Sequence, residues 1–239
     1  MYDIHSHIIY GVDDGAVSIE ESVEMARQAA AEEVDVIIAT PHYIEGLYVN
    51  EYEDNLERLN KIREQINKAG INISIYLGNE LLITPELPKL LKSGRVTTLN
   101  NSRYLLVELP FLDIPVYTEN VLFNLEIEGY KVILAHPEQN EQIIDDPNIL
   151  YRLIKHGVCV QMNLQSFEGK YGKRVKKTAQ FMLQHHMVHF VGTNRHSPRK
   201  SNFSMRDIAD RMSYYYKDNV LDLLFDNPAK IIKNECLQV

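Results

Sequence analysis

Histidine and carboxylate side chains recur along the chain in short polar motifs. His5 and His7 stand one residue apart near the N-terminus, and His42 follows a threonine and a proline. Further candidates follow at intervals: Glu80, Glu108, His136, Asn194 and His196. Imidazole and carboxylate without thiolate suit Zn, Mn or Fe, whereas a structural zinc cage usually recruits cysteine. The pattern therefore predicts a divalent-metal site assembled from distant segments.

Seven short apolar runs alternate with amphipathic segments. The runs are rich in β-branched residues and too short for buried helices, so we expect them to be strands. They cover residues 2–4, 34–39, 73–77, 104–109, 131–135, 158–162 and 188–192. Helical periodicity, with Ser18 and Glu21 at capping-box spacing, predicts helices between them. These cover residues 18–32, 51–68, 118–128, 148–156 and 173–186.

The alternation of strand and helix predicts the fold class. Because no linker, repeat or low-complexity tract interrupts it, we expect one α/β domain over residues 1–239. Seven β-then-α units at this length fit a closed, TIM-like (β/α)7 barrel better than an open sheet. A doubly wound open sheet remains the alternative.

In a parallel barrel, the loops that carry chemistry follow the C-terminal ends of the strands. Six of the seven predicted strands lead to a histidine, a glutamate or a carboxamide, and the sixth strand leads only to Asn163. A single histidine at a strand end has an ordinary structural explanation. Here six of seven strand ends carry such a residue, and in a barrel these ends meet on one rim. The candidates exceed what one ion needs, so we expect two or three ions with Glu80 bridging a pair. Such ions clamp a phosphate ester and supply a metal-bound hydroxide for in-line attack.

Composition excludes several other classes. The net charge of −8 argues against a nucleic-acid groove or an anionic membrane surface, because both require clustered positive charge. No apolar stretch approaches the ~20 residues of a membrane span, and the N-terminus lacks a signal-peptide pattern, so we expect no membrane insertion and a cytoplasmic location. A cysteine-dependent phosphatase is excluded because Gln165 stands where a C-x5-R loop starting at Cys159 needs arginine.

Taken in order, the motifs resemble the PHP (polymerase and histidinol phosphatase) superfamily. More closely, they resemble its manganese-dependent bacterial protein-tyrosine phosphatases of the capsule and exopolysaccharide type. The resemblance rests on D-I-H-S-H, V-D-D-G, A-T-P-H, G-N-E, the glutamate after the fourth strand, A-H-P-E and a final x-x-H. It runs from residue 1 to about 225 and implies a distorted (β/α)7 barrel, the PHP fold, with a trinuclear metal site.

The resemblance also implies which residues hold each ion. The first set is His5, His7, Glu80 and Asn194; the second is Glu80, Glu108 and His136; the third is Asp14, His42 and His196. Asp14 enters only through the resemblance, since it follows no strand end. Its neighbour Asp13 is expected to be a turn residue or to lie behind the ligands. Manganese is the expected metal, with iron and zinc as alternatives.

The chain departs from the family pattern at three positions. Asn194 stands in T-N-R-H where the relatives usually have aspartate, Gln139 replaces an arginine in H-P-E-R, and Ser201 replaces an arginine after the last histidine. An amide oxygen can coordinate a metal but brings no charge. Gln139, at one of the replaced arginines, and the nearby Arg195 and Arg199 are the candidate substrate-binding residues.

The resemblance implies a metal-dependent phosphomonoesterase, in particular a protein-tyrosine phosphatase that acts on a bacterial tyrosine kinase in polysaccharide biosynthesis. One alternative is a catalytically weakened relative that binds phosphotyrosine or the kinase without efficient turnover, because Asn194, Gln139 and Ser201 all lack charge. Another is a phosphatase for a small metabolite such as histidinol phosphate. The oligomeric state is left open.

Overall fold

The computed structural model describes residues 1–198, 204–215 and 220–237. Its strands all run parallel within two sheets, ordered β1-β2-β4 and β3-β5-β6-β7-β8-β9. The strands are β1 (Tyr2–Ser6), β2 (Val36–Ala39), β3 (His42–Tyr43), β4 (Ser74–Leu77), β5 (Glu80–Leu82), β6 (Tyr104–Glu108), β7 (Lys131–Ala135), β8 (Cys159–Asn163) and β9 (Phe190–Gly192). Every predicted strand segment overlaps one of these strands.

Two predicted strands, β2 and β4, are each followed by a short strand that was not predicted, and the gaps between them separate the two sheets. Thr40 and Pro41 divide β2 from β3, where proline has no N–H to give to a neighbouring strand. Gly78 and Asn79 divide β4 from β5. The backbone still bonds across both breaks, with Gly78 N donating to Ala39 O at 2.8 Å and Glu80 N donating to Pro41 O at 3.1 Å. The two sheets therefore continue each other as one distorted wall.

Hydrogen bonds between the first and last strands complete the ring. Asn194 N donates to His5 O at 2.8 Å, and His7 N donates to Arg195 O at 2.9 Å. Ser6 forms an isolated parallel bridge with Arg195. Seven strand positions thus surround the centre of the molecule, as predicted for a distorted (β/α)7 barrel.

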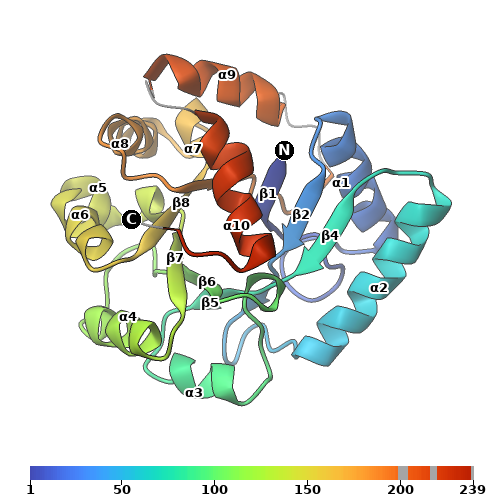
Figure 1. The fold of residues 1–239 in the computed structure, drawn as a ribbon, viewed down its shortest axis with the longest axis horizontal. Helices are drawn as coiled ribbons and strands as arrows, with labels where there is room; N and C mark the ends of the chain where they lie inside the picture. Colours follow the sequence, from blue (N-terminus) through green and yellow to red (C-terminus); the bar gives the residue numbers. More distant parts are fainter. Residues whose placement is uncertain (199–203, 216–219, 238–239) are drawn as a thin grey trace.

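Helices surround the strands (Figure 1). They are α1 (Ile19–Ala31), α2 (Tyr52–Lys68), α3 (Leu87–Lys92), α4 (Thr118–Ile127), α5 (Glu141–Asp145), α6 (Asn148–Lys155), α7 (Leu164–Glu168), α8 (Lys173–Gln184), α9 (Met205–Tyr215) and α10 (Asn227–Lys233), with short helical turns at η1 (Leu99–Asn101), η2 (Pro137–Gln139) and η3 (Asp222–Asp226). Five were predicted within two residues. No helix within the described ranges is long and apolar enough to cross a membrane.

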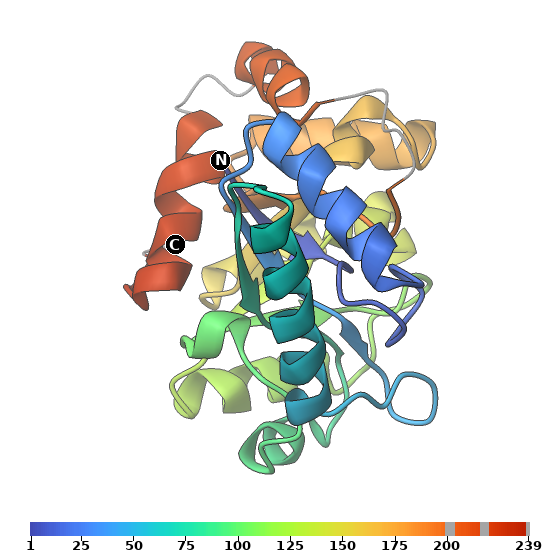
Figure 2. The same cartoon turned by 90° about the vertical axis from the view of Figure 1, so that its right-hand side faces the viewer.

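The barrel interior is apolar at one end and polar at the other. Ile4, Leu106 and Phe190 share one buried cluster with Ile231 of α10 and Leu237 after it, so the C-terminal segment covers the end where the strands begin. Figure 2 shows α10 on that side and the loops after β1 and β3 on the opposite side. Alternate residues of a strand face the same way, so inward positions change from apolar to polar along each strand.

Asp3 joins the two ends of the ring. Its Oδ1 accepts hydrogen bonds from the Thr193 backbone N at 2.9 Å and from the His5 backbone N at 3.3 Å. Oδ2 accepts from the Thr193 hydroxyl, and the carboxylate is almost fully buried. One carboxylate therefore satisfies three donors where β1 meets the segment after β9.

We expect Asp3→Ala to lower the free energy of unfolding by about 2–3 kcal/mol, because it leaves buried donors of Thr193 without an acceptor. Asp35→Ala is the matched control, since the Asp35 side chain is 73% exposed and its carboxylate forms a surface ion pair with the N-terminal amine. The control is expected to lose less than about 1 kcal/mol. Urea unfolding of the metal-free proteins measures both values, and equal losses would contradict the assigned role of Asp3.

Candidate metal centre

The two histidines at the end of β1 lie side by side in the interior of the barrel. His5 and His7 are fully buried, and their Nε2 atoms lie 3.2 Å apart. The chain leaves β1 after Ser6, and the His7 carbonyl accepts from Ala16 N at 3.1 Å. Because alternate residues of an extended chain face the same way, His5 and His7 present neighbouring ring nitrogens.

Two polar side chains hold these rings from behind. Nδ1 of His5 lies 2.9 Å from Oε1 of Gln161, and Gln161 in turn donates to Asn163 Oδ1 at 2.9 Å. Nδ1 of His7 lies 2.7 Å from Oδ2 of Asp13. A partner on Nδ1 fixes the ring orientation and leaves Nε2 free for a metal. The placement of Asp13 agrees with the expectation that it lies behind the ligands, whereas Gln161 was not predicted.

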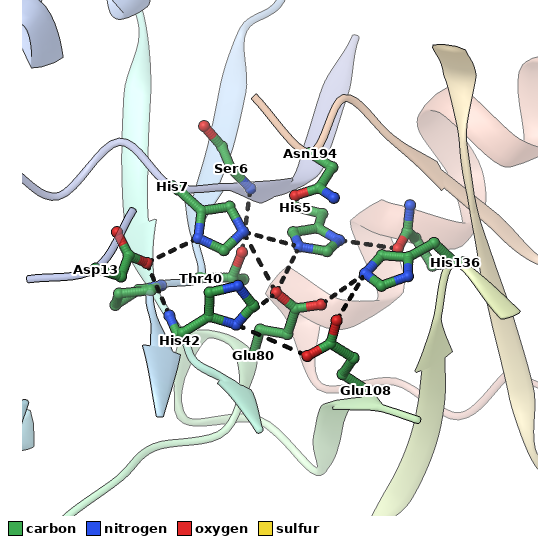
Figure 3. A network of polar contacts seen from close by, with 12 residues as sticks. His5, Ser6, His7, Asp13, Thr40, His42, Glu80, Glu108, His136 and Asn194 are labelled. Carbon is green, nitrogen blue, oxygen red and sulfur yellow. Dashed lines mark hydrogen bonds and ion pairs between the residues drawn. The ribbon is translucent and has the colours of Figure 1, made fainter. Parts of the chain in front are cut away.

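Glu80 is the centre of the cluster (Figure 3). Its Oε2 lies 3.1 Å from Nε2 of His5, 3.3 Å from Nε2 of His7 and 3.1 Å from Nδ1 of His42. Its Oε1 lies 2.8 Å from Nε2 of His136. Four imidazole rings therefore surround a single, fully buried carboxylate: two from strands β1 and β3 and two from the loops after β1 and β7.

The remaining candidates extend the cluster on two sides. Glu108 lies 3.7 Å from His136 and 4.0 Å from His42 through its two oxygens. Oδ1 of Asp14 lies 3.4 Å from Nε2 of His196 and 3.8 Å from Nε2 of His42. The ring of His196 stacks on that of His7 with a centroid distance of 3.9 Å. Asp14 is 53% exposed, so this end of the cluster opens to solvent.

Backbone geometry keeps the cluster compact. A Cβ atom on Gly15 would lie 2.2 Å from His7 O, and one on Gly192 would lie 2.8 Å from His5 Cβ. Only glycine therefore lets these two segments approach the β1 histidines. His136 and Asn194 adopt left-handed conformations, with φ of 32° and 46°. Such backbone is uncommon outside glycine and concentrates at functional sites.

Burial and hydrogen bonding divide the histidines into two groups. Burial alone would lower the pKa of every ring here. In His7, contacts with Asp13 and Glu80 outweigh burial and raise the pKa to about 10, and in His136, contact with Glu80 raises the pKa to about 9. In His5 and His42, burial prevails and lowers the pKa, to about 4 for His42.

The two central glutamates shift in opposite directions. Burial would raise the pKa of Glu80, but the surrounding histidine rings hold it well below its usual range. Burial and the neighbouring charge of Glu80 raise the pKa of Glu108 to about 7. Without a cation, two carboxylates this close do not ionise together easily.

The side chains fit divalent cations. Among the residues that the structure describes, three groups place their ligand atoms within 4.8 Å of one another: His5, His7 and Glu80; His42, Glu80 and Glu108; His7, Asp14, His42 and His196. Buried Nδ1 of His42, Oε2 of Glu80 and Oδ1 of Asn194 also lack hydrogen-bond partners. Buried polar atoms normally have hydrogen-bond partners. Bound cations would explain why these potential ligand atoms, which lie among imidazoles and carboxylates, have none.

The predicted substrate-binding residues fare differently. Gln139 lies half-buried at the end of η2, and its backbone N donates to His136 O at 3.0 Å. Arg195 instead forms hydrogen bonds of 2.8 and 3.0 Å to Glu32 at the end of α1, on the outside of β1. The guanidinium of Arg195 is therefore engaged between strand and helix, and its contact with substrate stays a prediction. Arg199 and Ser201 lie outside the described residues.

Fold and site together define a parallel α/β barrel whose C-terminal rim carries a histidine and carboxylate cluster suited to several metal ions. The model of the CpsB/CapC family of capsular polysaccharide synthesis matches residues 1–233, and the chain belongs to this family. It is 31% identical over 237 residues to the tyrosine-protein phosphatase YwqE of Bacillus subtilis, covering 99% of this chain and 93% of that protein. The family resemblance predicted from the motifs is confirmed.

Solved structures agree with the family assignment. One, from a description of Bacillus subtilis YwqE and Streptococcus pneumoniae CpsB as metal-dependent tyrosine phosphatases, matches with a TM-score of 0.94 and 31% identity, covering 100% of this chain and 96% of that one. Histidinol phosphate phosphatase from Lactococcus lactis matches with a TM-score of 0.58 and 13% identity over 90% of this chain and 92% of its own. The second match shows a shared fold alone.

At pH 7 the metal-free protein carries protons on His7 and His136, and a metal that uses these rings must displace them. We therefore expect Mn²⁺ binding at pH 7 to release protons, and affinity to rise with pH until about 9–10, where both rings are already neutral. Calorimetry in buffers of different ionisation enthalpy measures the release.

Asp13→Asn, which removes a carboxylate that holds the proton on His7, is expected to reduce the number of protons released. His185→Gln is the control, because His185 is an exposed residue at the end of α8. An affinity that stays constant between pH 7 and pH 9 would show that neither His7 nor His136 gives up a proton to the metal.

Proposed function

We propose that this chain is a metal-dependent protein-tyrosine phosphatase of capsular polysaccharide synthesis. The observation that carries the proposal is Glu80, a buried carboxylate contacted by four histidines at the rim of a barrel whose family relatives are tyrosine phosphatases. The substrate proposed is phosphotyrosine on a protein, in particular a bacterial tyrosine kinase, in the cytoplasm.

The proposed ligands follow the three sets expected from the resemblance. They are His5, His7, Glu80 and Asn194 for the first ion, Glu80, Glu108 and His136 for the second, and Asp14, His42 and His196 for the third. The close donor groups support most of these sets, although His7 also lies with the third set and His42 also lies with Glu80 and Glu108. Manganese is the proposed metal, with iron and zinc as alternatives.

The residues around the cluster have distinct tasks in this proposal. When bound, divalent ions supply positive charge for the transferring phosphoryl group and make water a stronger nucleophile at neutral pH. Gln161 and Asp13 keep protons on Nδ1 of His5 and His7, so that Nε2 of each ring faces the cluster. Gln139, beside His136, offers its amide to a phosphate oxygen.

A second candidate is a protein that binds phosphotyrosine without efficient turnover. Two observations favour it: Asn194 brings a neutral oxygen to the first set, and Arg195 is engaged with Glu32 away from the cluster. The neutral Asn194 lowers the negative charge that holds the metals. The engagement of Arg195 with Glu32 lowers the positive charge that holds the phosphoryl group. The two candidates differ in turnover and share the metal centre.

The test compares aryl-phosphate hydrolysis by the native protein and Asn194→Asp with added Mn²⁺. We expect turnover by the native protein with at least two ions bound per chain, and about tenfold tighter binding of one ion in the variant, because a charged ligand replaces a neutral one. The left-handed backbone at residue 194 tolerates both asparagine and aspartate, so the change is local. Asn124→Asp, on the exposed face of α4, is the control.

Each alternative result has a defined meaning. Metal analysis that finds no bound ion would overturn the assigned ligands. Two bound ions without turnover in either protein would favour the binding candidate. A large gain in turnover in Asn194→Asp would show that the neutral ligand limits the native enzyme, and equal, substantial rates would show that asparagine is an effective ligand.

A further inference from the structure

Two aromatic rings stand beside ligand candidates on opposite sides of Glu80. The ring of Tyr48 lies parallel to that of His42, with a centroid distance of 5.7 Å and an interplanar angle of 9°. The ring of Phe111 lies parallel to that of His136, at 6.0 Å and 17°. Because His42 contacts Oε2 of Glu80 and His136 contacts Oε1, the two rings flank the cluster from different loops.

The loop that carries Phe111 is held in place by hydrogen bonds. The Asn140 amide donates to Pro110 O at 2.7 Å and to Asp113 O at 3.1 Å, and Asn140 is almost fully buried. The carbonyl of Phe111 itself accepts from Glu141 N at 2.8 Å. Phe111 therefore projects from a fixed backbone, although its side chain is 52% exposed.

Tyr48 is held in a similar way. Its backbone N and O each bond to Ile44 at 2.9 Å, which closes a tight hairpin directly after β3. Gly46 occupies the turn with a φ of 81°, a conformation that glycine adopts without strain. The hairpin follows His42 by a few residues, so ring and ligand candidate belong to one compact segment.

The same two loops expose several large apolar side chains. Among the exposed large apolar side chains of the described residues, five lie between residues 44–50 or 110–117: Leu47, Val49, Phe111, Leu112 and Val116. Isolated exposed apolar residues are ordinary, but a group beside a cluster of polar side chains indicates a binding surface. The polar cluster and its apolar margin together suit a ligand with a charged head and an apolar body.

We propose that Tyr48 and Phe111 form the two walls of a slot that receives the aryl ring of the substrate, and that this slot makes the site select aryl over alkyl phosphates. The inference deepens the proposed function and rests on it. Aromatic rings gain from offset or edge-to-face contact beyond the area they bury. Phosphoserine has no ring to place between the two walls, so it cannot gain this contact.

The test measures binding with two non-hydrolysable probes, phenylphosphonate and methylphosphonate, which share a phosphoryl head and differ in the ring. Each is titrated by calorimetry into the Mn²⁺-loaded protein after its metal content has been measured. The native protein is expected to bind phenylphosphonate at least about tenfold more tightly. Phe111→Ala and Tyr48→Ala are each expected to reduce that ratio several-fold and to leave the affinity for methylphosphonate unchanged.

Matched controls separate the slot from general exposure of aromatic rings. Phe123→Ala and Tyr151→Ala remove rings that are 61% and 46% exposed on α4 and α6, outside the candidate site, and are expected to leave the ratio unchanged. Tyr48→Phe keeps the ring and is expected to keep the preference. Phe111→Leu keeps apolar character without a ring and is expected to lose most of the preference for phenylphosphonate that Phe111 contributes.

The outcomes are distinguishable from those of the proposed function. A native protein that binds neither probe, or binds both equally, overturns the slot, as does a ratio that survives in both alanine variants. Hydrolysis of a phosphotyrosine peptide is measured in parallel. A clear preference for phenylphosphonate without hydrolysis keeps the slot and rejects the phosphatase, whereas hydrolysis without preference does the reverse.

Discussion

The structure depends on one buried carboxylate among imidazole rings. Glu80 is fully buried, and four histidines from three separate segments reach its two oxygens. A carboxylate in such a position is costly unless positive charge accompanies it. Protons on His7 and His136 supply that charge in the metal-free protein, and cations bound at the same place would supply it otherwise. The elements around Glu80 are arranged so that this exchange of protons for metal can take place.

Much of the fold could be predicted from periodicity, because short apolar runs and capped amphipathic segments are local signals. The short strands β3 and β5, which follow Thr40-Pro41 and Gly78-Asn79, could not, since two or three residues are too few to show a strand pattern. The short helices α3, α5 and α7 are too brief for a clear helical period. The covering of the barrel end by α10 depends on contacts with Ile4 and Phe190 that no local pattern reveals.

The candidate site was predictable to a similar degree. The histidines and glutamates could be found because they follow strands, and a barrel brings strand ends together. Gln161 lies within a strand and has no such signal; only its position two residues after the inward-facing Cys159 indicates which way it points. Arg195 shares a motif with His196, yet its side chain meets Glu32, which is 163 residues away in the sequence. Neighbours along a chain can face opposite sides of a wall, and composition alone does not separate them.

The closure of the ring through Asp3 has a consequence for biosynthesis. Asp3 and Thr193 are 190 residues apart, and β1 has no neighbour on that side until the segment after β9 has been made. During translation, the edge of β1 that carries His5 and His7 therefore stays unpaired until the segment around Thr193 has been synthesised. Long-range pairing of this kind forms late in folding. Closure of the ring around His5 and His7 is thus a late step in folding, because it requires a segment that lies 190 residues after Asp3.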